Sequence, residues 1–184
     1  MKKILFNDKY SLTQAVLAGL KTMTRRLLKD GTPLGNWEET AKCLPYKVGD
    51  IVAIAQPYKD IIECLPMYSD AILDEMGMPR KEYKAGWTNK MFVKANLLPH
   101  HIRITDIKVE RLQSISVDDI LCEGVWQFYN NKNLFYVSKN IGYAHEVAFP
   151  SAREAFWYLI DSISGKGTWE SNPLVVAYSF ELVD

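Results

Sequence analysis

The sequence predicts an α+β fold in which a small, mostly antiparallel β-barrel carries two to three short helices at its edge. Residues 101–110 and 176–182 alternate apolar and polar side chains, as strands with one buried face do. Two capping boxes, which begin at Ser11 and Ser151, mark the starts of helices. Strands and helices do not alternate regularly along the chain, which argues against the βαβ order of a doubly wound parallel sheet.

The first half of the chain predicts one helix and two extended segments. The box at Ser11 opens a short helix that Gly19 ends. Residues 21–28 are dense in Thr and Arg and suit an extended segment, after which glycines and prolines indicate a loop over residues 31–45. The continuous apolar run of residues 51–55 follows a Val-Gly-Asp turn and predicts a strand buried on both faces.

The middle of the chain predicts an interrupted strand and a second short helix. The alternation changes phase between residues 101–104 and 107–110, which indicates a bulge or a turn at residues 105–106. Ser116 then caps a short helix that ends before Gly124.

The longest predicted helix begins at the Ser151 box. Its expected core face consists of Phe156, Leu159, Ile160 and Ile163. A polar loop leads from this helix to the final strand over residues 176–182. Residues 59–90 and 127–148 show no clean period, so we interpret them as irregular insertions in a single domain of residues 1–184.

Charge and cysteine content narrow the class of protein. The chain has 184 residues, and its 22 basic residues balance its 22 acidic ones. A protein that binds nucleic acid mainly through counterion release is expected to carry a net basic excess. The three cysteines are odd in number and form no CxxC pair, which is typical of reduced thiols in a cytosolic protein. Without an export signal or an apolar run of roughly 18 residues, we expect a cytoplasmic protein that does not engage a membrane.

The richest polar segment lies where the first helix meets the extended segment. It contains Lys21, Thr22, Thr24, Arg25 and Arg26. One interpretation is a solvated basic edge with β-forming residues between the charges. The other is chemical: nearby apolar strands desolvate Lys21 and ease the loss of its proton, so that its amine serves as the base for the Thr24 hydroxyl. In a straight strand these two side chains face opposite ways, so this second interpretation requires Lys21 to lie in the turn.

This segment resembles the signature of a known family. Residues 17–26, Leu-Ala-Gly-Leu-Lys-Thr-Met-Thr-Arg-Arg, are similar to the LxGxKTxTxR signature of the ASCH domain, a PUA-like small β-barrel family. Further pieces follow in the same order: Val-Gly-Asp at 48–50, residues 107–112 leading to Ile-Ser at 115–116, and Glu-Gly-Val at 123–125. Trp169, Asn172 and Pro173 resemble the tail of the phage- and prophage-associated branch. The resemblance covers most of the chain but misses residues 59–90 and 127–148.

The resemblance implies a barrel with a cleft, likened to RNA-binding PUA domains. In small bacterial members it also implies an amidohydrolase that removes the acetyl group from N4-acetylcytidine. The family's Lys, Thr and Glu fall on Lys21, Thr24 and Glu123. Thr24 would attack the amide carbonyl, Lys21 would take its proton, and Glu123 would orient the lysine or protonate the leaving amine, assistance typically worth about 10²- to 10⁴-fold. By itself, Glu123 is also compatible with a carboxylate at a helix end.

One departure from the phage branch affects the expected site. Those relatives commonly carry Arg-Glu followed by Thr-Trp after the Gly-Asp strand, whereas this chain reads Ala-Gln-Pro-Tyr over residues 55–58. The loss of both charges indicates altered specificity or no catalysis. Gln56 can still hydrogen-bond to a base edge and Tyr58 can still stack on a base. The expected substrate-binding set is Thr22, Arg25, Arg26, Gln56 and Tyr58.

Two other functions stay open on the sequence alone. In the first, the basic segment holds the phosphate of RNA or of a modified nucleotide while Tyr58 or Trp126 stacks on a base. In the second, the chain is an interaction protein of a mobile element and uses the aromatic segment 126–143. The expected partner is a small modified nucleoside or a short RNA. No cofactor or metal is expected, since His100 and His101 point to opposite sides of a strand.

Overall fold

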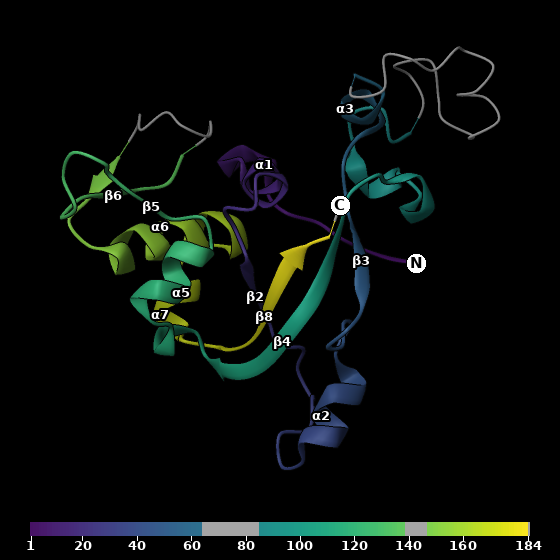
Figure 1. Cartoon of the computed structure of the whole chain (residues 1–184). Helices are drawn as coiled ribbons and strands as arrows, with labels where there is room; N and C mark the ends of the chain where they lie inside the picture. Colours follow the sequence, from purple (N-terminus) through teal and green to yellow (C-terminus); the bar gives the residue numbers. More distant parts are fainter. Residues whose placement is uncertain (64–84, 139–146, 184) are drawn as a thin grey trace.

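The structure is a computed structural model that describes residues 1–63, 85–138 and 147–183. Its main sheet has five strands in the order β1-β3-β4-β8-β2 (Figure 1). The strands are β1 (Lys2–Ile4), β3 (Ile51–Ile54), β4 (His101–Arg111), β8 (Leu174–Leu182) and β2 (Met23–Leu27). The β1–β3 pair is parallel and the other three pairs are antiparallel. The predicted α+β class with a mostly antiparallel sheet is therefore confirmed. Strands β1 and β2 form the two edges, and no pairing between them closes the sheet within the described part of the chain.

Strands β4 and β8 form the centre of the sheet. Figure 1 shows β4 as a long curved strand that runs beside β8, and the two pair from Ile102 and Leu182 to Arg111 and Leu174. Their register shifts between Ile104 and Asp106. This irregularity confirms the bulge predicted from the change of phase, and it lets one continuous strand bend where the sequence allowed either a bulge or a turn.

The three predicted helices are present as α1 (Leu12–Leu17), α5 (Val117–Cys122) and α6 (Ala152–Ser164). The side chains of Ser116 and Ser151 accept hydrogen bonds from the backbone N–H three residues later, as the predicted cap at Ser116 and capping box at Ser151 require. The expected side-chain cap at Ser11 is wrong, because this residue has a left-handed backbone (φ 53°) and its side chain makes no capping hydrogen bond to α1.

Two helices lie where the sequence predicts loops. They are α2 (Trp37–Cys43) and α7 (Thr168–Ser171). The side chain of Asn36 caps α2 by accepting a hydrogen bond from Glu38 N. The loop predictions for residues 31–45 and for the segment after α6 are therefore wrong at these two places.

The two segments interpreted as insertions contain short regular elements in their described parts. The first includes α3 (Tyr58–Glu63) and a 3-10 helix at Lys90–Phe92, which a second 3-10 helix follows at Ala95–Leu97. The second contains a small sheet of β5 (Trp126–Gln127), β6 (Phe135–Tyr136) and β7 (Ala148–Phe149). Residues 64–84 and 139–146 lie outside the described residues.

The main core fills the space between the five-stranded sheet and α6. Of the expected core face of α6, Phe156 and Leu159 are buried, Ile160 is half-buried and Ile163 is exposed. The prediction for Ile163 is thus wrong, because the side chain in this last turn of α6 is exposed instead of packed in the core. A smaller apolar cluster around Tyr58 packs separately against Ala53. In the described part of the chain no helix is long and apolar enough to cross a membrane.

Candidate functional site

A cavity of about 110 Å³ lies among the edge strand β2, the segment of residues 5–7, and helix α6. Most of its wall is apolar, but one group of polar residues is buried in it. These residues are Lys21, Thr24, Arg25 and Glu123, and Arg26 adds an exposed cation. The structure therefore brings together on one cavity the three residues expected to be catalytic and two of those expected to bind substrate.

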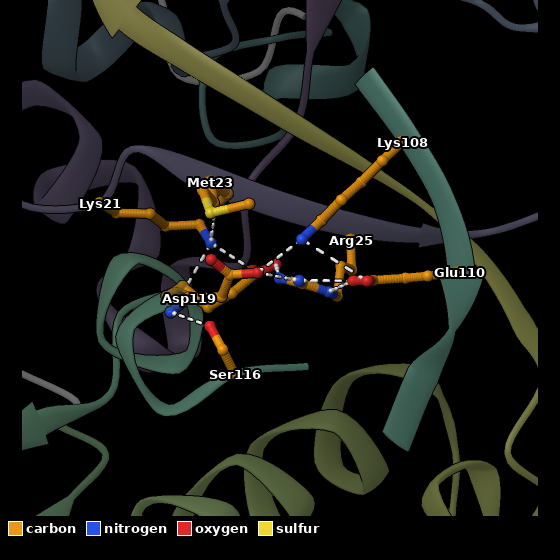
Figure 2. A network of polar contacts seen from close by, with 8 residues as sticks. Lys21, Met23, Arg25, Lys108, Glu110, Ser116 and Asp119 are labelled. Atoms are coloured by element: carbon orange, nitrogen blue, oxygen red, sulfur yellow. Dashed lines mark hydrogen bonds and ion pairs between the residues drawn. The ribbon is translucent and has the colours of Figure 1, made fainter. Parts of the chain in front are cut away.

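Lys21 lies in the turn between α1 and β2, as the chemical interpretation requires. Its backbone N–H donates to Ala15 O at 3.0 Å, and its side chain is almost completely buried (2% exposed). The Nζ atom donates to Met23 O at 2.6 Å, to Glu123 O at 2.8 Å and to Glu123 Oε2 at 2.8 Å. Figure 2 shows the Lys21 side chain pointing toward Met23 and into the polar network.

Burial and the neighbouring carboxylate have opposite effects on the pKa of Lys21. Burial lowers the pKa of Lys21 below its ordinary value, and the Glu123 carboxylate opposes this shift. An ammonium group has three N–H donors and no acceptor, so the three oxygen atoms around Nζ match its charged form. The arrangement is therefore that of an ammonium ion in a desolvated site, which can lose its proton most directly to Glu123.

Arg25 links Glu123 to two further carboxylates. Its Nη1 donates to Glu123 Oε1 at 3.1 Å, while Nε and Nη2 donate to Glu110 Oε1 at 2.9 and 2.6 Å. Nη2 also donates to Asp119 Oδ2 at 2.6 Å. Burial alone would lower the pKa of Arg25, but these carboxylates raise it above its ordinary value. Glu123 is thus held by Lys21 on one oxygen atom and by Arg25 on the other.

The network continues outward to Lys108 (Figure 2). Lys108 Nζ donates to Asp119 Oδ2 at 2.8 Å and lies 3.5 Å from Glu110 Oε2. Burial would raise the pKa of Asp119, but hydrogen bonds from Lys108 and Arg25 hold it below its ordinary value. Lys21, Arg25 and Lys108 therefore face an equal number of carboxylates, those of Glu110, Asp119 and Glu123.

This network corrects one sequence-based interpretation. The solvated basic edge expected as an alternative is not present at Lys21 or Arg25, since both are buried and paired with carboxylates. Of the three basic residues at positions 21, 25 and 26, Arg26 is the exposed one.

Glu123 is positioned by the end of α5 and by Gly124. Gly124 has a φ of +98°, and a Cβ atom there would lie 2.7 Å from Leu12 Cδ2. The chain can thus turn sharply after Glu123 while Leu12 packs directly on the turn. The hydrogen bond from Thr22 N to Cys122 O (3.0 Å) fixes the end of α5 to the segment that carries Lys21.

Thr24 and Arg26 leave the face of β2 opposite to Arg25, because successive side chains of a strand alternate. Since β2 is an edge strand, residues from both of its faces reach the cavity. Thr24 is buried (5% exposed) and lines the cavity. Arg26 donates to Leu5 O. The Phe6 ring adjoins both cations, with its centroid 5.9 Å from Lys21 Nζ and 6.0 Å from Arg26 Cζ.

Three residues of the expected substrate-binding set do not line this cavity: Thr22, Gln56 and Tyr58. Tyr58 is buried in the smaller apolar cluster. Gln56 is buried after β3, and its Oε1 atom has no hydrogen-bond partner among the described residues. Their roles in binding substrate remain predictions, and the geometry does not group them with Lys21.

Sequence reasoning did not identify Lys108, Glu110 and Asp119 as part of the site. Lys108 and Glu110 are two residues apart on one face of β4, and Asp119 lies in the first turn of α5. Their pattern is also that of ordinary solvent-facing charges, so the signal in the sequence is weak. Within residues 1–63, 85–138 and 147–183, no group of three or more His, Cys, Asp or Glu side chains is arranged to hold a metal ion.

Comparison with family models found no match, and comparison with curated protein sequences found none either. Two solved structures are similar in fold to the chain. One is a DUF984 protein from Enterococcus faecalis, with 16% identity and a TM-score of 0.47, over 100% of this chain and 81% of that chain. The other is an ASCH domain from Lactobacillus crispatus, with 13% identity and a TM-score of 0.39, over 96% of this chain and 75% of that chain.

Proposed function

We propose that this chain is an ASCH-type amidohydrolase that removes an acyl group from the exocyclic amine of a nucleobase, with an N4-acylcytidine as the substrate class. One observation carries the proposal. The buried Thr24, the almost fully buried Lys21 and the carboxylate of Glu123, which accepts a hydrogen bond from Lys21, line a single cavity. The resemblance of residues 17–26 to the ASCH signature supports the same assignment of roles.

The proposed reaction starts with a proton transfer inside the buried pair. Lys21 passes a proton to Glu123 over the 2.8 Å hydrogen bond, which leaves a neutral amine and a carboxylic acid. Burial favours this transfer because it penalises both charges. No hydrogen bond joins Lys21 Nζ to Thr24 Oγ1, so bound substrate has to bring the hydroxyl and the amine together, as often happens at catalytic contacts that are loose without substrate.

The chemical steps then proceed through an ester of Thr24. Thr24 Oγ1 bonds to the amide carbon while its proton passes to Lys21 Nζ. The C–N bond breaks, and the leaving amine takes the proton held by Glu123, which restores the ammonium–carboxylate pair. Water next adds to the acyl carbon, its proton passes to Oγ1 as the ester bond breaks, and a carboxylic acid leaves. The net change is amide plus water to amine plus carboxylic acid.

The geometry favours this proposal over the nucleic-acid-binding alternative. A phosphate grip would need free cations, whereas Lys21 and Arg25 are buried and already paired with carboxylates. The alternative of a mobile-element interaction protein depends on residues 126–143, part of which lies outside the described residues. The small sheet that contains Trp126 supplies no further argument for it.

The test is hydrolysis of N4-acetylcytidine by purified protein, followed as release of cytidine. We expect turnover that falls by about 10²- to 10⁴-fold in Lys21→Met and in Thr24→Val, and that returns in part in Thr24→Ser, which keeps a hydroxyl. Thr105→Val is the matched control, because Thr105 is exposed and does not line the cavity. Absence of turnover by the folded wild-type protein, or full activity in Thr24→Val, would contradict the proposal.

A further inference from the structure

The cavity has a buried apolar end and an open end, and α6 runs along both. Phe156 and Leu159 are 1% and 2% exposed, Ile160 is half-buried, and Ile163 near the end of α6 is 38% exposed. All four line the cavity. The exposure of successive turns of α6 therefore marks a direction from the core to solvent.

The size of the cavity limits what it can enclose. An apolar cavity of roughly 150 Å³ holds one benzene molecule, and the cavity here is smaller, at about 110 Å³. A nucleobase with its ribose does not fit inside such a space. Only the smaller part of an acylated nucleoside, its acyl group, can be enclosed.

The position of the reactive groups decides which way the substrate lies. Thr24, Lys21 and Glu123 are all buried, so the amide carbonyl has to reach well below the surface. Arg26 and Ser164 are exposed lining residues and mark the open end. The nucleoside then lies toward Arg26 and Ser164, and the acyl chain extends toward the apolar wall.

We infer, on the basis of the proposed amidohydrolase function, that Leu112, Phe156 and Leu159 form an acyl pocket that selects aliphatic acyl groups of about three to five carbon atoms. All three side chains are buried and line the cavity. An acetyl group leaves part of this wall without contact, which forfeits the gain from burying apolar surface. An aromatic acyl group overfills the space that remains beside the polar residues.

The experiment is a series of kcat/KM measurements with N4-acetyl-, N4-propionyl-, N4-butyryl- and N4-benzoylcytidine. We expect an increase of about four- to tenfold for each added methylene up to butyryl, followed by a fall for benzoyl. Turnover of every substrate without preference, or with acetyl as the best, would overturn the acyl pocket and leave the proposed function standing. No turnover of any substrate would remove the proposed function and this inference with it.

Substitution of Leu159 tests whether its side chain limits the size of the acyl group that the cavity accepts. Leu159→Ala should raise the benzoyl-to-acetyl ratio of kcat/KM at least tenfold, and Leu159→Phe should lower the butyryl-to-acetyl ratio by a similar factor. These ratios do not depend on how much of each variant is folded. Trp157→Phe is the control on the same helix, because Trp157 does not line the cavity, and its ratios should equal those of the wild type. Unchanged ratios in both Leu159 variants would overturn the inference.

Discussion

The inner and outer parts of the ion network differ in their access to water. In the inner part, the side chains of Lys21 and Glu123 are 1% and 7% exposed. In the outer part, Lys108 is 43% exposed and its partner Asp119 is 21% exposed. Both parts have hydrogen bonds of 2.8 Å, so distance does not distinguish them. The same ion-pair geometry is therefore desolvated in the inner part, where we propose the catalytic role, whereas water screens the charges in the outer part.

Removal of Arg25, which joins the two parts, should have the largest effect on stability. Arg25→Met leaves the carboxylates of Glu110, Asp119 and Glu123 without their shared partner. Loss of one partner from a buried ionic cluster typically costs about 3–5 kcal/mol of unfolding free energy. Urea unfolding at pH 7 measures this cost. Arg25→Lys should recover only part of it, because an ammonium group cannot reproduce the planar fork of the guanidinium, and a cost below that of Lys108→Met would contradict the comparison.

Substitution of Gly124 tests whether the close packing of Leu12 on this turn stabilises the inner part of the network. Gly124→Ala forces a side chain into a left-handed conformation and places a Cβ atom 2.7 Å from Leu12 Cδ2. We expect a loss of about 1–3 kcal/mol, together with reduced hydrolysis, since Glu123 precedes this turn. Gly49→Ala is the matched control, because Gly49 also has a positive φ (+88°) but no heavy atom within 4 Å of the added Cβ. Equal thermal destabilisation in the two variants would show that the contact with Leu12 does not matter.

The outer part should respond to acid. The pKa of Asp119 is lowered in the folded protein by hydrogen bonds from Lys108 and Arg25, against the effect of burial. The stabilisation is therefore fully present above the unfolded-state pKa of about 3.9, and it is lost as pH falls through the lower folded-state value. Asp119→Asn should destabilise the protein at pH 7 and much less near pH 3. A cost that is the same at both pH values in urea unfolding would refute this assignment.

The smallest effect is expected for Lys108. Because its side chain is 43% exposed, Lys108→Met should cost less than about 1 kcal/mol, and the cost should shrink further at high salt. Urea unfolding at low and high sodium chloride concentration measures both. A cost that does not change with salt would show that the outer part is less screened than its exposure indicates.

The sequence predicted those structural elements that depend on interactions between residues close together in the chain. The caps at Ser116 and Ser151 use side chains and N–H groups three residues apart, so their pattern is visible in the chain itself. The phase change before residue 107 likewise predicted the bulge in β4. Helix α2 was missed although Asn36 precedes Glu38 and Glu39, an N-cap with an acidic first turn. The glycines and prolines around that segment outweighed this signal.

Only part of the candidate site was identified from the sequence, and local interactions along the chain do not account for it. Lys21 and Thr24 were singled out by their chemistry as well as by a family resemblance, whereas Glu123 was identified through the resemblance alone, since nothing local in the chain joins residue 21 to residue 123. Arg25 was expected to hold substrate, but the structure pairs it with three carboxylates from β4 and α5. Such pairings depend on which elements meet in space, and periodicity does not determine that.

The balance of charges around Arg25 has a consequence for how a ligand approaches. Three cations and three carboxylates in alternation leave this network without a net charge, so its field cancels over a distance comparable with the Debye length. The network therefore gives little long-range steering to an ion of either sign. The association rate of a neutral molecule is unaffected by this lack of steering, because its encounter with the cavity depends on diffusion and on shape fit alone.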